Sequence, residues 1–273
     1  MHQLMLLAAL AASSVADTGN PTNFHYSSHL GATTASVDAW AKPKGAYSFR
    51  VGGKLVVRDG TRVLLSTDPW PLTGIDGGVA DGTAISLDEL QLAALSDAKY
   101  PEVILTTSGC GANCNGATTI LTYDGGSSTY KLPSNAAGFY GQGGDVVTIG
   151  AKQFLKATLA SPSFDCHACG EGTTPLLVRV RNGKLTDAMS EFPDRLRSDA
   201  AQAWSDYERA LAKSDSDEPP PEDALFRYYA DEVRLGNRAA AIARLRGASA
   251  LHGKVDAFVS ESDVRLRAGG ISQ

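Results

Sequence analysis

Two close pairs of cysteines are the residues best suited to chemistry: Cys110 with Cys114, and Cys166 with Cys169. Paired thiols can form disulfides, bind a metal or exchange electrons with other thiols. The second pair has the Cys-x-x-Cys spacing of thiol-disulfide oxidoreductases, in which the N-terminus of a helix lowers the pKa of the first thiol. The residues that follow, Gly170-Glu171-Gly172-Thr173-Thr174-Pro175, cannot start a helix. We therefore expect disulfides that brace loops, with a thiol-disulfide oxidoreductase using Cys166 and Cys169 as the alternative.

The compartment decides between disulfides and metal binding. An apolar run from Leu4 to Ala12 is followed by the small residues Ser14-Val15-Ala16, which indicates a signal peptide over residues 1–16. The run is shorter than the roughly 20 residues needed to span a bilayer. We expect a periplasmic or secreted protein without membrane insertion, whose thiols are oxidised before they can form a four-thiolate zinc site. Local pairing within each pair is preferred, and pairing between the two pairs stays open.

No other residues form a recognisable catalytic or metal-binding pattern. His25 and His29 have a spacing that suits a metal on one helical face, but the segment Asn23–Gly31 lacks helical periodicity, and we expect it to be a solvated arm. Asp88 and Glu89 are interpreted as a solvated turn, and Glu102 as the residue at which a strand begins. Motifs of zinc proteases, serine hydrolases and phosphate-binding loops are missing from the sequence. We expect a non-catalytic protein without a cofactor or a bound metal.

The composition describes an ordinary folded chain. Of its 273 residues 43% are hydrophobic and 20% are charged, and the formal net charge is −5. This balance excludes a disordered or fibrous protein. It also argues against nucleic acid as a partner, because no basic field is present to neutralise phosphates.

Two segments are candidates for contact with a protein partner. Trp70 lies between Pro69 and Pro71. If its ring were exposed, the stiff backbone would make it a preorganised anchor, whereas the alternative is a ring folded onto the edge of a sheet. The acidic linker Asp215–Glu218 would attract a basic protein or serve only as a solvated connector.

The pattern of the chain changes near residue 190, with 23 of the 28 glycines before it. The first part, residues 17–190, has short β-rich runs that end at turn dipeptides such as Asp59-Gly60, Asp124-Gly125 and Asn182-Gly183. We expect a mainly β, antiparallel body with strands over residues 54–58, 103–107, 118–123, 146–149 and 176–181.

The second part is helical. An apolar stripe from Leu196 to Leu211 predicts one helix, and Pro221 can begin a second helix that runs to Leu235 and stops at Gly236. Asn237 can cap a third helix that ends near Gly247. We expect a helical region over residues 191–250 and a tail over residues 251–273.

The stretch from Pro101 to Gly125 and the stretch from Gly144 to Lys184 share an order of strand, cysteine pair, strand and turn, which indicates an internal repeat. This order, with Pro101-Glu102-Val103-Ile104-Leu105 and Tyr123-Asp124-Gly125, resembles an FG-GAP or VCBS-type repeat. The resemblance implies blades of a β-propeller, here a partial, propeller-like body.

Blades of that family commonly carry a calcium loop of alternating aspartates before the Pro-Glu. The matching positions here are Ala94, Ser96 and Ala98, with only Asp97 nearby, and in the second copy they are Phe139, Gly141 and Gly143. Because calcium takes six to eight oxygen ligands, we expect neither loop to bind it.

Taken together, these patterns predict an exported, non-catalytic binding protein whose partner is another protein. A concrete version is a protective inhibitor that binds a basic cell-wall-degrading enzyme, since the negative net charge would speed such an encounter.

Overall fold

The computed structural model describes residues 21–43, 48–73, 79–81, 84–110, 116–136, 142–161, 173–212 and 220–271. The predicted signal peptide, the acidic linker, Cys114, Cys166 and Cys169 lie outside these ranges, as do Phe139 and Gly141 of the second calcium loop.

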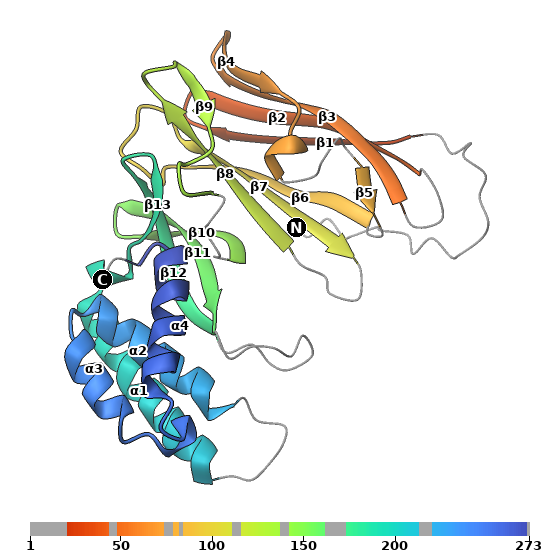
Figure 1. Ribbon diagram of the computed structural model, residues 1–273. Coiled ribbons are helices and arrows are strands. Elements are labelled where there is room, and N and C mark those ends of the chain that lie inside the picture. The colour runs from red at the N-terminus through yellow and green to blue at the C-terminus, as the bar shows by residue number, and fades with distance from the viewer. Residues whose placement is uncertain are drawn as a thin grey trace.

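Three antiparallel sheets follow one another along the chain, each built from consecutive strands (Figure 1). The N-terminal sheet has the order β1 (Thr22–Leu30), β2 (Thr33–Pro43), β3 (Ser48–Asp59) and β4 (Arg62–Thr67), with β5 (Val79–Asp81) also paired to β3. The middle sheet contains β6 (Ala84–Ala93), β7 (Glu102–Cys110), β8 (Gly116–Asp124) and β9 (Thr129–Lys131). The third sheet contains β10 (Gln142–Ile149), β11 (Lys152–Ala160), β12 (Thr173–Arg181) and β13 (Lys184–Asp187).

Four α-helices complete the chain: α1 (Pro193–Ala212), α2 (Pro221–Arg234), α3 (Arg238–Leu245) and α4 (Val255–Ala268). Short 3-10 turns lie at Pro71–Thr73, Met189–Glu191 and Ser249–Leu251. The predicted fold class, an antiparallel, blade-like β body followed by a helical region, is confirmed.

The predicted hairpin turns join neighbouring strands. Asn182 and Gly183 connect β12 to β13 with φ angles of 51° and 69°. A two-residue turn that matches the strand twist needs a positive φ at both positions, which asparagine and glycine tolerate best. The Asp59-Gly60 and Asp124-Gly125 dipeptides also lie where β3 and β8 end, as expected, with Asp59 and Asp124 as the last strand residues.

The sheets pack face to face, so the middle sheet is buried on both sides. Val103 and Leu105 of β7 belong to the core shared with the N-terminal sheet. Ile104, between them, belongs to the core shared with the third sheet and the helices. Because side chains alternate across a strand, three consecutive apolar residues serve two interfaces.

The segment from Ala94 to Pro101 connects β6 to β7 and fastens the middle sheet to the third. The carbonyl of Leu95 accepts hydrogen bonds from the backbone N–H of Val180 at 3.0 Å and from Arg179 Nε at 3.1 Å. Ala94 donates its N–H to Gln153 Oε1 at 2.7 Å. We call residues 94–101 the connecting loop.

The side chain of Glu102, at the start of β7, anchors the connecting loop through hydrogen bonds. Its carboxylate is fully buried and accepts hydrogen bonds from Leu95 N–H at 2.8 Å, Ser96 Oγ at 2.5 Å and Thr122 Oγ1 at 3.3 Å. The interpretation of Glu102 as the residue at which a strand begins agrees with this position.

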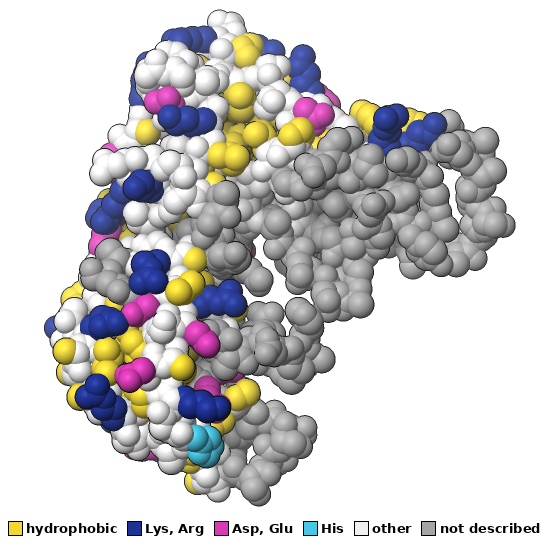
Figure 2. Space-filling view, in the orientation of Figure 1, with side chains coloured by type: hydrophobic (Ala, Val, Ile, Leu, Met, Phe, Trp, Pro, Cys, Tyr) yellow, Lys and Arg dark blue, Asp and Glu magenta, His cyan; other side chains and the backbone are white. Residues whose placement is uncertain are grey.

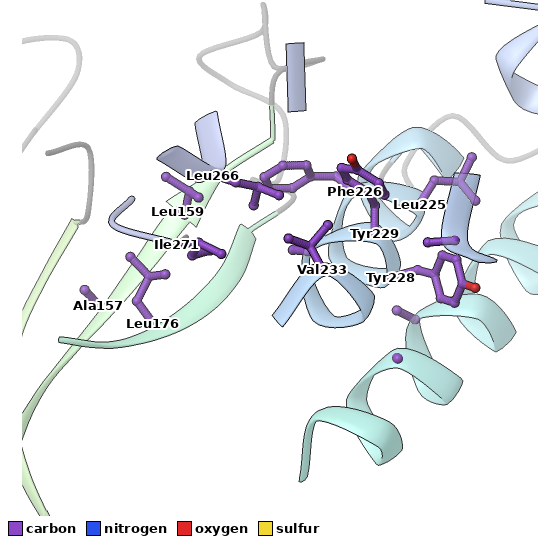
Figure 3. Close-up of a cluster of buried hydrophobic side chains, with 14 of the residues drawn as sticks. Ala157, Leu159, Leu176, Leu225, Phe226, Tyr228, Tyr229, Val233, Leu266 and Ile271 are labelled. Atoms are coloured by element: carbon purple, nitrogen blue, oxygen red, sulfur yellow. The ribbon is translucent and has the colours of Figure 1, made fainter. Parts of the chain in front are cut away.

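The helices close the far end of the stack of sheets. Leu159 and Leu176 of the third sheet lie beside Leu266 of α4 and Ile271 after it, and Val233 of α2 lies close to them (Figure 3). The stripe of α1 is buried at Leu196, Ala200, Ala203 and Tyr207 and ends before Leu211, which is 46% exposed.

Two expectations about the helical region need correction. Residues 251–273 are not merely a tail, because α4 occupies most of them and buries Phe258, Val259 and Leu266. Asn237 occupies the N-cap position of α3 but makes no capping bond, because its side chain donates to Glu232 Oε2 at 2.9 Å instead. Gly236 ends α2 with a φ of 79°, as its position predicted.

A buried ion cluster joins α2 to the third sheet. Arg234 donates from Nε to Asp187 Oδ2 at 2.7 Å, and from Nη1 to Asp231 Oδ1 at 2.8 Å and Thr174 Oγ1 at 3.0 Å. Its Nη2 donates to the carbonyl of Pro175 at 2.7 Å. The side chains of the three charged residues are between 1% and 3% exposed. We call Arg234, Asp187 and Asp231 the junction cluster.

The junction cluster predicts a dependence of stability on pH. Burial raises the pKa of Asp231 to about 6, although Arg234 acts in the opposite direction. A raised folded-state pKa means that the stabilisation is complete below the unfolded value of 3.8 and is lost as pH rises through about 6. We expect this residue to contribute a loss of up to about 3 kcal/mol across that window.

Urea unfolding at pH 4 and pH 7 measures this effect. Asp231→Asn should lose less stability than the wild type between the two values, because asparagine does not titrate. Equal losses in both proteins would show that folding does not raise the pKa of Asp231.

Candidate functional site

Both cysteine pairs belong to connections between the second and third strands of their sheets. Cys110 is the last residue of β7, its side chain is outside the described part, and β8 begins at Gly116. The second pair falls between the end of β11 at Ala160 and the start of β12 at Thr173. The disulfides stay predictions, because the other three cysteines are not described.

The strand order aligns the two stretches of the predicted repeat differently from the sequence pattern. By strand order, β7 corresponds to β11, whereas the sequence comparison matched it with residues 144–148 of β10. The offset arises because β11, between Lys152 and Ala160, was not recognised as a strand. The N-terminal sheet has the same order of four consecutive strands, with β5 also paired to β3, so this strand order occurs three times, and the internal sequence repeat stays a prediction.

The first described element after the second cysteine pair is a strand and not a helix. β12 begins at Thr173, four positions after Cys169. A thiol oxidoreductase needs a long helix at this point to lower the pKa of its first cysteine.

Trp70 is not an exposed anchor. Its side chain is 3% exposed and belongs to the core between the N-terminal and middle sheets. The backbone N–H of Trp70 donates to Asp68 Oδ1 at 3.0 Å, which turns the chain so that the ring faces inward. The alternative, a ring folded onto the edge of a sheet, is closer to the structure, in which the ring is buried between two sheets.

The segment expected to be a solvated arm is the strand β1. It pairs with β2 along its whole length, from Thr22 opposite Ala41 to Leu30 opposite Thr33. His25 Nδ1 lies 2.7 Å from Asp38 Oδ1 across this pair, and both side chains are exposed. Asp38 thus supplies the carboxylate that the sequence did not pair with His25.

Residues at the positions that match the family's calcium loop take part in the connecting loop. Ser96 donates to Glu102, and Asp97 Oδ1 lies 3.2 Å from Arg179 Nη2. Gly143 lies within β10. Among the described residues no three His, Cys, Asp or Glu side chains are grouped as a metal site requires.

The strongest candidate for function is the face of the N-terminal sheet that points away from the middle sheet. Alternate residues of β2 and β3, among them Val37, Ala39 and Leu55, point into the core. The residues between them point outward. We define the outer face by Asn23, His25, Asp38, Trp40, Lys42, Arg50, Gly52, Lys54 and Arg58.

Trp40 lies flat on the outer face over a glycine. Its register partner on β3 is Gly52, and a Cβ atom at that position would stand only 2.4 Å from Trp40 Cζ2 and 2.6 Å from Cε2. Only glycine permits this contact. The indole is partly exposed, so one side of the ring rests on the backbone and the other is available to a ligand.

The outer face is cationic although the chain is acidic overall. Among the nine residues that define the outer face, Lys42, Arg50, Lys54 and Arg58 contribute four positive charges and Asp38 contributes one carboxylate. Asp81 of β5, the register partner of Ser48, occupies a position on the same side of the sheet. None of the four cations forms an ion pair with a described side chain. Figure 2 shows Lys and Arg side chains at the top of the molecule, over the N-terminal sheet.

Lys42 and Arg50 are direct partners across β2 and β3. Like charges at directly opposed positions destabilise a sheet. An anion bound between the two side chains would relieve this repulsion.

Sequence reasoning missed the outer face because net charge averages over the chain. The signal was the spacing of Arg50, Lys54 and Arg58, every fourth residue of one strand, which places all three on the same face. The expectation that no basic field is present fails for this sheet.

Comparison with known proteins provides no relative: no family model, curated protein or solved structure matches the chain. The described helices include none that is long and apolar enough to cross a membrane.

Proposed function

We propose that this chain is an exported, non-catalytic binding protein that presents the outer face of its N-terminal sheet to an anionic macromolecule. The single observation behind the proposal is Trp40, held flat on Gly52 among four cations that form no ion pair with a described side chain. Tryptophan and arginine are the residue types that most often dominate binding energy at interfaces.

The outer face suits a binding function better than a catalytic one. It is an open sheet surface without a buried nucleophile, and its one close His–carboxylate pair, His25 with Asp38, is 63% and 74% exposed. Catalytic groups gain strength from exclusion of water, which such exposure prevents.

The expected basic cell-wall-degrading enzyme is a poor partner for this particular face, because like charges repel. The inhibitor hypothesis would require another surface of the molecule. An acidic partner has the complementary charge for the outer face.

Charge reversal on the outer face tests the proposal. Wild-type protein should bind at least one of a panel of immobilised polyanions, with an affinity that falls as salt is added. Lys42→Glu combined with Arg50→Glu should weaken binding at least tenfold, measured by biolayer interferometry.

The matched control is Lys156→Glu combined with Lys254→Glu, which changes the net charge equally at exposed lysines on β11 and before α4. This variant should bind within about twofold of wild type, because exposed charges farther apart than the Debye length of about 8–10 Å are largely screened. Equal losses in the two variants would show that only overall charge matters, and the proposal would be withdrawn.

A further inference from the structure

We infer that the ligand of the outer face is a polysaccharide built of uronic acids, with one sugar ring stacked on Trp40 and its carboxylates paired with the flanking cations. This inference depends on the proposed function, because it names the ligand class of the same surface.

The first step is the shape of the platform. Trp40 lies against Gly52, so the exposed side of its ring is a flat surface level with the sheet and not a projecting wedge. The face of an indole carries negative electrostatic potential. The C–H bonds on one face of a pyranose ring are weakly positive, so a sugar ring and the indole are complementary in shape and charge.

The second step is the arrangement of charge around the platform. Along β3, Arg50 lies two residues before Gly52 and Lys54 two residues after it, so each is about 7 Å from the platform in opposite directions. Arg58 continues the series about 13–14 Å beyond Lys54. An extended chain with regularly spaced carboxylates can therefore contact cations on both sides of the stacked ring.

The third step is the supply of hydrogen-bonding groups beside the ring. Asn23 is the register partner of Trp40 on β1, and His25 is the partner of Asp38 in the next outward-facing row. Amide and imidazole groups can donate to and accept from sugar hydroxyls, and a carboxylate can accept from them. Arginine at position 50 has the planar fork that matches a carboxylate.

The same observations disfavour other anionic partners. Single-stranded nucleic acid stacks successive bases on several aromatic rings, whereas Trp40 is the one aromatic side chain of the outer face as defined. An anionic membrane requires a broad apolar surface, and most of these residues are polar or charged. Extended peptides bind mainly along a sheet edge and not across its face.

Calorimetry with a defined uronate ligand tests the inference. Hexagalacturonate should bind the wild-type protein, and neutral maltohexaose should not. Trp40→Ala should weaken hexagalacturonate binding at least tenfold while changing binding to poly-glutamate less than threefold. Trp40→Phe, which keeps a flat ring, should recover part of the lost affinity.

Gly52→Ala provides an independent variant, because the new methyl group must lift the indole off the backbone. It should weaken binding to hexagalacturonate, and its thermal unfolding and circular dichroism check that the sheet remains folded. If this variant does not fold, the two Trp40 variants decide the question.

The outcomes separate the inference from the proposed function. Binding of poly-glutamate, single-stranded DNA or anionic vesicles in preference to hexagalacturonate, with Lys42 and Arg50 still required, would overturn the uronate assignment and leave the anion-binding function intact. No binding to any of these polyanions would overturn both.

Discussion

Replacing Arg234 with methionine should lower the free energy of unfolding by about 3–5 kcal/mol, because it leaves two buried carboxylates without their cation. Asp187 and Asp231 are 2% and 3% exposed, and Arg234 also satisfies Thr174 and the carbonyl of Pro175. Methionine keeps most of the length of the side chain, so the loss comes mainly from charge and hydrogen bonds. Urea unfolding followed by circular dichroism measures it.

Arg246→Met is the matched control, since Arg246 follows α3 and is exposed. A change within about 0.5 kcal/mol is expected there, as for most surface substitutions. If Arg234→Met cost no more than this control, the junction cluster would not contribute to the attachment of the helices to the third sheet.

Replacing Glu102 with alanine should cost about 3 kcal/mol, because the N–H of Leu95 is left buried without an acceptor and a cavity forms beneath the connecting loop. The hydroxyls of Ser96 and Thr122 lose the same acceptor. The connecting loop carries the hydrogen bonds to Val180 and Arg179, so the attachment of the middle sheet to the third should weaken as well.

Glu102→Gln separates charge from hydrogen bonding. Burial raises the pKa of Glu102, which shows that the ionised form is costly at this position despite its three donors. Glutamine keeps one acceptor oxygen and removes the charge, so it should cost less than alanine. Hydrogen exchange of the Leu95 amide should rise strongly in Glu102→Ala, and protection equal to wild type would contradict the role assigned to this carboxylate.

Local patterns in the sequence predicted much of the fold. The turn dipeptides marked three hairpins, an apolar stripe located α1, and the start and stop residues Pro221, Gly236, Asn237 and Gly247 located α2 and α3. Strands such as β1 and β2 were missed because their outward residues are polar and their inward residues include small ones such as Ala35 and Ala39. Their strand character depends on pairing with each other and on burial against the middle sheet.

The candidate site was harder to predict than the fold. Trp70, flanked by prolines, attracted attention but is buried, whereas Trp40 has no local signal until Gly52 is placed opposite it. The contact between them joins positions twelve residues apart and depends on the register of β2 with β3. Cations spaced along one strand form a positively charged surface only when the sheet places them on the same face.

The proposed binding face and the helical region lie at opposite ends of the stack of three sheets. The core beneath the N-terminal sheet shares no described buried residue with the core that joins the third sheet to the helices. Substitutions on the exposed side of the first layer can therefore accumulate without disturbing the helical end of the molecule. Under the proposed function, such an arrangement would let evolution change the ligand preference by exchanging a few surface side chains while the rest of the scaffold stays unchanged.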